Sequence, residues 1–240
     1  MRKPVALLFV LAIFCALAAV SLSQGKPSPA PILQLDPSAK FGLANAQIQW
    51  QEYRGRQAAK LAPLPGHERD VDQEMQATLV DSDFQDGIIE IDVAGARRQG
   101  YSTAEDTTGY KGMIGVTFRI QNGRSERFYV RPQNARLNNQ LFRNRSTQYE
   151  SAPDFPWNQL REDHPGEYES YVDLDPGAWT HLKIEVSGIK ARLYVNNAPQ
   201  PCLIVNELKQ GSSRGKIALW ARISTDAYFS NLKLSPTTAF

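Results

Sequence analysis

Two carboxylates on one predicted strand are the residues of this chain best placed to do chemistry. Glu90 and Asp92 stand two positions apart within the alternating segment 88–93. Side chains two positions apart on a strand leave the same face of a sheet. Paired carboxylates can bind sugar hydroxyls, and in glycosidases they transfer protons. We predict ligand binding by both residues, and we name them as candidates for catalysis without assigning a catalytic role, although Glu167, Glu169 or Asp154 could supply an acid from the segment 133–170.

The neighbouring strands carry cationic and aromatic side chains at the matching positions. Arg119, Tyr129 and Arg131 alternate with apolar residues, so we expect them on the face that points away from the core. Arginine donates paired hydrogen bonds to hydroxyls or to an acidic sugar, and an aromatic ring covers the apolar face of a pyranose. One polar face that binds sugar is therefore predicted, and the alternative is a solvated face whose charges pair across strands. Four further side chains share this parity: Thr117, Arg127, Lys216 and Trp220.

The segment 133–170 is long for a connection within a compact domain, and such segments commonly carry function. It is rich in amides, arginines and aromatic residues, which suit hydrogen-bonded recognition. An alternative that can hold at the same time is an insertion anchored on the domain by Phe155, Trp157 and Leu160. We expect four of its residues to bind ligand above the sheet face: Gln133, Tyr149, Trp157 and Arg161.

The elements that must position these residues are short strands. Alternating apolar residues recur in 48–53, 56–61, 74–80, 88–93, 113–121, 127–131 and repeatedly after 177. Turn residues separate the segments, and Asn122–Gly123 between two of them is a hairpin signal. No long stretch has a helical period. The pattern predicts an all-β fold, a two-sheet antiparallel β-sandwich with one dry face on each sheet.

Five motifs support a more specific fold. Residues 84–93 read Phe-x-Asp-Gly-x-Ile-Glu-x-Asp-Val. The other four motifs are Gly-Val-x-Phe-Arg at 115–119, Tyr-Val-Arg-Pro at 129–132, Trp-x-x-Leu-Lys-Ile-x-Val at 179–186 and Phe-Ser-Asn at 229–231. Together they resemble the concanavalin A-like lectin/glucanase superfamily in its laminin-G-like form, and they are similar to the domain described as 3-keto-disaccharide hydrolase. The resemblance implies a concanavalin A-like jelly roll over roughly residues 46–234. Because members include sugar binders, glycosidases and interaction modules, function must be argued from the site.

The resemblance also allows one catalytic strand to be compared. Glucanases of this superfamily carry Glu-x-Asp-x-(x)-Glu, whose first Glu is the nucleophile and whose last Glu is the acid/base. Here residues 90–95 read Glu-Ile-Asp-Val-Ala-Gly, so Ala94 or Gly95 stands where the third carboxylate is needed, and neither can transfer a proton. We expect binding in preference to cleavage by this mechanism. A glycoside-cleaving enzyme of the 3-keto-disaccharide hydrolase type, with Glu90 or Asp92 as general base, is the alternative.

The sequence offers little metal chemistry. Asp81, Asp83 and Asp86 resemble part of a calcium loop, but their spacing is wrong and no bidentate Glu follows. An Asp-rich turn before a strand is the preferred interpretation, and calcium is kept only as an alternative because some laminin-G-like modules bind it. The three histidines are scattered and do not have the spacing of zinc ligands. We expect no cofactor.

The first 23 residues have the pattern of a cleaved signal peptide: two basic residues, an apolar run and small residues near Ser23. We therefore expect a leader over 1–23, a Pro-rich tether over 24–40 and one domain over 41–240, secreted or periplasmic and without an integral membrane span after cleavage. The chain has 27 basic and 25 acidic residues, so removing Arg2 and Lys3 leaves 25 of each. Nucleic acid is therefore not an expected partner.

Of the two cysteines, Cys15 belongs to the leader, so the mature chain would have no internal disulfide, and Cys202 reads as a small buried hydrophobe. The leading hypothesis is a carbohydrate-binding, lectin-like module that recognises glycan or a glycan-bearing surface. The alternatives are the glycosidase described above and a structural or protein-interaction laminin-G-like module with a protein partner.

Overall fold

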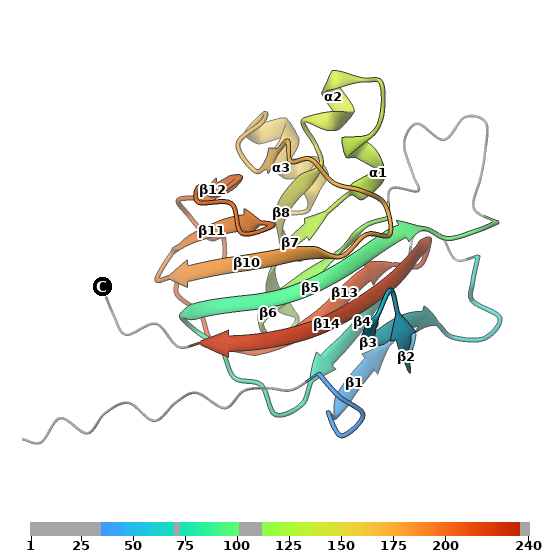
Figure 1. Ribbon diagram of the computed structural model, residues 1–240. Coiled ribbons are helices and arrows are strands. Elements are labelled where there is room, and N and C mark those ends of the chain that lie inside the picture. Colours follow the sequence, from blue (N-terminus) through green and yellow to red (C-terminus); the bar gives the residue numbers. More distant parts are fainter. Residues whose placement is uncertain (1–34, 70–72, 101–111, 236–240) are drawn as a thin grey trace, which may run out of the picture.

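A computed structural model describes residues 35–69, 73–100 and 112–235 of the chain. Its strands form two antiparallel sheets packed against each other (Figure 1). Sheet A has the order β1 (Phe41–Ala44), β4 (Glu74–Leu79), β13 (Lys216–Arg222), β6 (Ile114–Gln121), β7 (Arg124–Val130), β8 (Thr147–Ala152), β9 (Glu169–Ser170). Sheet B has the order β12 (Leu203–Val205), β11 (Lys190–Val195), β10 (Thr180–Ser187), β5 (Gly87–Arg97), β14 (Thr225–Ser235), β3 (Arg56–Pro63), β2 (Ala46–Tyr53). The predicted two-sheet antiparallel sandwich is confirmed.

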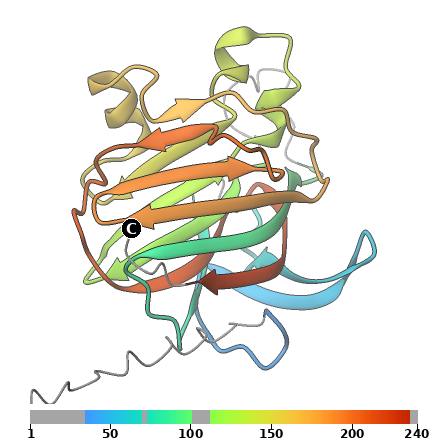
Figure 2. The same cartoon turned by 60° about the vertical axis from the view of Figure 1, so that its left-hand side comes forward.

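The core lies between the sheets, where the sequence alternation placed it. The apolar members of each strand are buried while their neighbours point outward, because successive side chains on a strand leave opposite faces. Figure 2 shows sheet B in front, with β10, β11 and β5 side by side. The buried residues from both sheets include Ile89, Ile91, Val93, Val116, Phe118, Leu182, Ile184, Leu193, Ile217 and Leu219. The assignment of these residues to the core is confirmed, whereas Ile120 of β6, also expected there, is only half-buried.

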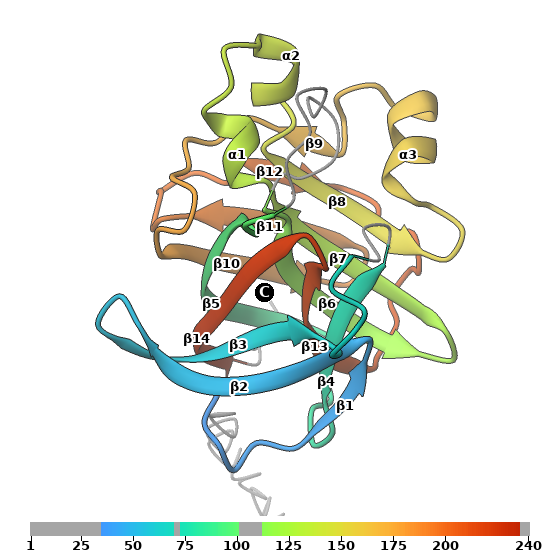
Figure 3. The same cartoon turned by 90° about the vertical axis from the view of Figure 1, so that its right-hand side faces the viewer.

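Segment 133–170 is more ordered than the sequence indicated. It contains α1 (Pro132–Ala135), α2 (Gln140–Arg143) and α3 (Trp157–Asp163), together with β8 and β9. Helices this short have no clear 3.6-residue period, which explains why the pattern did not reveal them. The three helices gather around the end of sheet A where β8 and β9 lie, away from β1 (Figures 1 and 3). The segment therefore builds a wall at one edge of the sandwich.

Two other expectations concern boundaries. Strand β5 continues to Arg97, beyond the end of the alternating segment 88–93, and residues 101–111 lie outside the described part. The predicted leader and most of the predicted tether also fall outside it, with only residues 35–40 described. Among the helices of the described residues, none has the length and apolar character needed to cross a membrane. Cys202 packs against the core, and burial raises the pKa of its thiol to about 12, so its predicted hydrophobic role is confirmed.

One carboxylate occupies the interior. Glu126 on β7 is fully buried and accepts hydrogen bonds from the Tyr149 hydroxyl at 2.6 Å and from the Gln210 amide at 2.8 Å. Burial raises the pKa of Glu126 above its ordinary value, although both hydrogen bonds oppose that rise. The folded state therefore holds the proton of Glu126 more tightly than the unfolded chain does.

This gives a pH prediction. A carboxyl whose pKa is raised by folding loses its stabilising contribution as the pH rises from the unfolded pKa through the folded one. The free energy of unfolding of Glu126→Gln, minus that of the wild type, should increase with pH over that window. Urea unfolding of both proteins between about pH 4 and pH 8 measures the difference, and a difference that stays flat or falls with pH would contradict the assignment.

Candidate functional site

The candidate site lies on the outer face of sheet A, where β7, β8 and β9 are neighbours and carry several polar and charged side chains. Tyr129 on β7 is paired with Gln148 on β8, and Gln148 with Glu169 on β9. Residues directly opposite each other in antiparallel strands share a face, so these three side chains form one row. Arg131 extends the row by donating to the Tyr129 hydroxyl at 2.8 Å and to Gln148 Oε1 at 3.1 Å.

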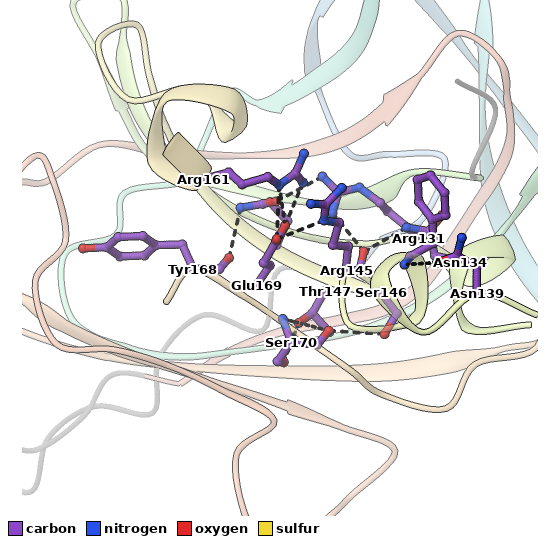
Figure 4. A network of polar contacts seen from close by, with 12 residues as sticks. Arg131, Asn134, Asn139, Arg145, Ser146, Thr147, Arg161, Tyr168, Glu169 and Ser170 are labelled. Carbon is purple, nitrogen blue, oxygen red and sulfur yellow. Dashed lines mark hydrogen bonds and ion pairs between the residues drawn. The ribbon is translucent and has the colours of Figure 1, made fainter. Parts of the chain in front are cut away.

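Two arginines hold the carboxylate at the end of this row. Arg161 binds Glu169 in a fork, with Nη2 at 2.7 Å from Oε2 and Nε at 3.1 Å from each oxygen. Arg145 approaches from the other side, with Nε at 3.2 Å from Glu169 Oε1. Figure 4 shows the three side chains meeting, with Arg131 close by. Bidentate arginine–carboxylate pairs have strict geometry, so Glu169 fixes where the Arg161 guanidinium lies.

The helices place these arginines. In α3, Trp157 and Arg161 stand four positions apart, which brings them onto one face of the helix, and the Arg161 guanidinium carbon lies 4.6 Å from the Trp157 ring centroid. Asn139 caps α2, since its side chain accepts from the Phe142 amide at 3.3 Å, and Arg145 follows that helix. The backbone carbonyl of Arg145 is in turn bound by Arg131 at 2.9 Å.

These elements enclose a surface hollow of ≈ 350 Å³, which we call the arginine hollow. Sugar-sized ligands occupy hollows of about this volume or larger. Tyr171 supplies an aromatic ring that is 40% exposed, and Arg143 donates to its hydroxyl at 2.7 Å. The residues that line the hollow are Leu141, Asn144, Arg145, Arg161, Pro165, Gly166, Glu169, Ser170 and Tyr171.

Positive charge in and beside the hollow exceeds negative charge. Arg131 is buried, and its hydrogen-bond partners are neutral oxygens of Tyr129, Gln148 and the Arg145 backbone. Burial lowers the pKa of Arg145, and the neighbouring charge of Arg161 lowers it further, against the opposing effect of Glu169. Glu169 is thus the shared ion-pair partner of Arg145 and Arg161, while Arg131 has no ion-pair partner among the described residues.

The middle of the same face carries a closed ionic cluster. Arg127 bonds Glu150 at 2.6 Å and Glu74 at 3.0 Å, and its guanidinium carbon lies 4.2 Å from the Trp220 ring centroid. Burial would raise the pKa of Glu74, but the charge of Arg127 and the hydrogen bonds from Trp220 and Arg127 outweigh burial and hold that pKa below its ordinary value. Arg127 and Trp220 are both nearly inaccessible. The charged groups of this cluster pair with one another, and the cluster joins β4, β13, β7 and β8.

The shared polar face expected from strand parity is wrong for three residues: Glu90, Asp92 and Arg119. Glu90 and Asp92 do point away from the core, but they lie on β5 of sheet B, so the core separates them from Tyr129 and Arg131 on sheet A. Asp92 accepts hydrogen bonds from Arg56 at 2.6 Å, from His181 at 2.8 Å and from Asn231 at 2.7 Å. The parity of a residue determines from which side of its strand the side chain projects, but it does not determine to which sheet the strand belongs.

Arg119 and Tyr149 also lie elsewhere than expected. Arg119 adopts a left-handed conformation with φ of 53°, at a bulge where the β6–β7 register shifts, and its side chain turns inward. A bulge reverses the alternation beyond it. Tyr149 is a fully buried residue of β8, not part of a covering loop, and its ring lies 5.4 Å from that of Phe128. Neither residue reaches the arginine hollow.

The remaining predicted residues divide as follows. Trp157, Arg161 and Arg131 gather at or beside the hollow, and Tyr129 lies next to Arg131. Gln133 is in α1, and its buried Oε1 has no hydrogen-bond partner. For calcium, Asp83 is held by Arg214 at 2.7 Å and Asp86 by Arg119 at 3.1 Å, while Asp81 is exposed. No group of three potential metal ligands occurs among the described residues.

Sequence reasoning left Arg145, Glu169 and Tyr171 out of the predicted site. All three belong to or follow the long segment 133–170, whose enrichment in arginine and aromatic residues was the available signal. Strand β9 is only two residues long, which is too short to show an alternation that would have assigned Glu169 to a face.

Comparison with known proteins supports the fold. The chain matches no family model and no curated protein. The carbohydrate-binding module CBM66 from Bacillus subtilis has 13% sequence identity with this chain and a TM-score of 0.50, and the match covers 81% of this chain and 97% of that one. A protein with a galectin-like fold from Bacillus subtilis has 9% identity and a TM-score of 0.51, covering 84% and 100%. At these identities the likeness shows the fold, and the implied concanavalin A-like jelly roll is confirmed.

Proposed function

We propose that this chain is an exported carbohydrate-binding module whose glycan site is the arginine hollow. The observation that carries the proposal is the convergence of Arg145, Arg161 and the exposed ring of Tyr171 around a hollow of ≈ 350 Å³. The jelly roll is a fold that the similar carbohydrate-binding module shares, which agrees with the proposal. Export rests on the predicted leader over residues 1–23.

The chemistry of the hollow suits a sugar. Guanidinium groups donate several hydrogen bonds in a fixed plane, which matches pairs of vicinal hydroxyls. Tyr171 at the wall and Trp157 beside it, which is 38% exposed, offer aromatic faces on which a pyranose ring can lie. Asn144 adds an amide whose Oδ1 already accepts from Gln140, while the Ser170 hydroxyl is bonded to Thr147 and to the Cys202 carbonyl.

The site favours binding over cleavage. Glycosidases of the common type need two carboxyl groups on opposite sides of the scissile bond. Among the described residues Glu169 is the one acidic residue that lines the hollow, where it accepts hydrogen bonds from Arg161 and lies 3.2 Å from Arg145 Nε. The residues present therefore support recognition of a glycan through hydrogen bonds and ring contact.

A glycan array tests the proposal with the wild type and two variants. Trp157→Ala removes an exposed ring beside the hollow and should weaken binding to the glycans that the wild type retains by about tenfold, which corresponds to about 1.4 kcal/mol. Leu43→Ala is the matched control, because Leu43 is an exposed apolar residue of β1 at the other edge of sheet A. It should bind as the wild type does.

Failure of the wild type to bind any glycan on an array that covers neutral and acidic sugars would overturn the proposal. If Trp157→Ala and Leu43→Ala lose glycan affinity to the same degree, the assignment of the glycan site to the hollow is wrong. Glu90→Gln adds a separate check: since Glu90 lies on sheet B, glycan binding should not change.

A further inference from the structure

We infer that the glycan recognised in the arginine hollow carries an anionic substituent, a carboxylate or a sulfate, which is bound by Arg145. This inference rests on the proposed function and adds the chemical class of the ligand. It follows from three features of the hollow: the unused donors of Arg145, the excess of positive charge around it, and the way in which Glu169 is already held.

The donors of Arg145 are the first feature. Its Nε lies 3.2 Å from Glu169 Oε1 without the geometry of a hydrogen bond, and no hydrogen bond joins its two Nη atoms to another described residue. Arg161, by contrast, uses both Nε and Nη2 on the Glu169 carboxylate. The side chain of Arg145 is 22% exposed and lines the hollow. A planar pair of donors is therefore left at the wall, in the geometry that binds a carboxylate or sulfate in bidentate fashion.

The charge balance is the second feature. Arg145 and Arg161 share one carboxylate, Glu169, and Arg131 beside them bonds only neutral oxygens, which leaves a local charge of two positive units (three arginines minus one glutamate). Two other carboxylates lie near these groups and are already paired. Asp173, 3.4 Å from the Tyr171 hydroxyl, pairs with Arg136 at 3.1 Å, and Glu150, 3.5 Å from the Tyr129 hydroxyl, pairs with Arg127 at 2.6 Å. Arg143, bonded to Tyr171, adds to the positive side. Partly buried cations without counterions are costly, and an anionic ligand would supply the missing charge.

Glu169 is the third feature, because it shows what these arginines bind. An internal carboxylate already sits in the fork of Arg161, so the hollow is built around carboxylate recognition. A neutral sugar would leave the excess charge of Arg131 and Arg145 unchanged. A sugar with an anionic group would neutralise it, and the difference should appear as preference for acidic glycans and as sensitivity to salt.

The experiment compares matched oligosaccharides by titration calorimetry at two ionic strengths. One arm uses oligogalacturonate against the corresponding neutral oligogalactose, and a second uses sulfated against unsulfated oligogalactose. The wild type should bind at least one acidic member about tenfold or more tightly than its neutral partner, and added salt should reduce that preference. Preference confined to one arm identifies the group as carboxylate or sulfate, and either result supports the inference.

Two variants locate the effect. Arg145→Gln removes one charge while Arg161 still holds Glu169, and it should lose about tenfold in affinity for the acidic glycan and less than about twofold for the neutral one. Arg214→Gln makes the same change of net charge at an exposed residue that is paired with Asp83, and it should retain the preference. If Arg145→Gln fails to fold, titrations of the wild type with the matched acidic and neutral oligosaccharides at two ionic strengths still test whether an anionic ligand is preferred.

The outcomes separate the two proposals. Equal affinity for acidic and neutral members overturns the anionic ligand while leaving glycan binding intact. Absence of binding to every member overturns both. Loss of the preference in Arg214→Gln to the same degree as in Arg145→Gln would show general electrostatic attraction and would overturn the assignment to Arg145.

Discussion

Arg119→Met is expected to lower the free energy of unfolding by about 3–5 kcal/mol, the range found when one partner of a buried ionic network is removed. The Arg119 side chain is fully buried and donates to the backbone carbonyls of Gln85, Gly211 and Gly188 at 2.9, 2.7 and 2.8 Å. It also pairs with the Asp86 carboxylate at 3.1 Å.

The reason for so large an effect is the number of groups that depend on one guanidinium. Methionine fills a similar length without donating, so three partly buried carbonyl oxygens would lose a partner, and a fully buried group left unsatisfied costs about 1–3 kcal/mol. These carbonyls belong to the turn before β5, the turn between β10 and β11, and the segment before β13. Arg119 therefore ties the two sheets together at one end of the sandwich.

Chemical denaturation measures this effect, with Arg214→Met as the control. Arg214 also pairs with an aspartate, Asp83, at 2.7 Å, but both side chains are 60% exposed. Exposed pairs contribute about 0–1 kcal/mol, so the control should change stability little. Similar losses in the two variants would mean that the position of Arg119 at the bulge confers no special stability.

Arg127→Met is the second prediction with a large expected effect, again about 3–5 kcal/mol. Arg127 joins Glu150 and Glu74, and its Nε donates to the Thr117 hydroxyl at 3.0 Å. The side chain of Glu150 is only 10% exposed, so removing Arg127 would leave a buried carboxylate without its ion-pair partner on the face of sheet A. Packing of the guanidinium against Trp220 would be lost as well.

The loss should depend on pH in a defined direction. Because folding lowers the pKa of Glu74, its contribution is present above the unfolded pKa and disappears as the pH falls through the folded pKa. The stability difference between wild type and Arg127→Met should therefore be greatest near neutral pH and should shrink in acid. Urea unfolding at several pH values measures it.

Arg136→Met is the matched control for Arg127. Arg136 likewise pairs with two carboxylates, Asp173 at 3.1 Å and Asp175 at 2.7 Å, but it is 46% exposed. Its replacement should cost less than about 1 kcal/mol. A difference for Arg127→Met that grows toward acid pH would contradict the role given to Glu74.

The alternation of residues was enough to predict the sandwich and its core. Burial of one face of each strand needs apolar residues at every second position, and that requirement is visible in segments such as 182–186 and 89–93 without knowledge of any partner strand. Trp157 and Arg161, which the sequence placed together in the long segment rich in arginine and aromatic residues, lie against each other in α3, and their predicted role in binding ligand stays a prediction.

Only the tertiary structure decided which side chains meet. Strand parity gives each residue a side of its own strand, but a sandwich has two outer faces, and pairing placed Glu90 on one and Arg131 on the other. A local bulge turned Arg119 inward, and a two-residue strand brought Glu169 to Arg145 and Arg161. These outcomes depend on contacts between residues far apart in the chain, which no local pattern encodes.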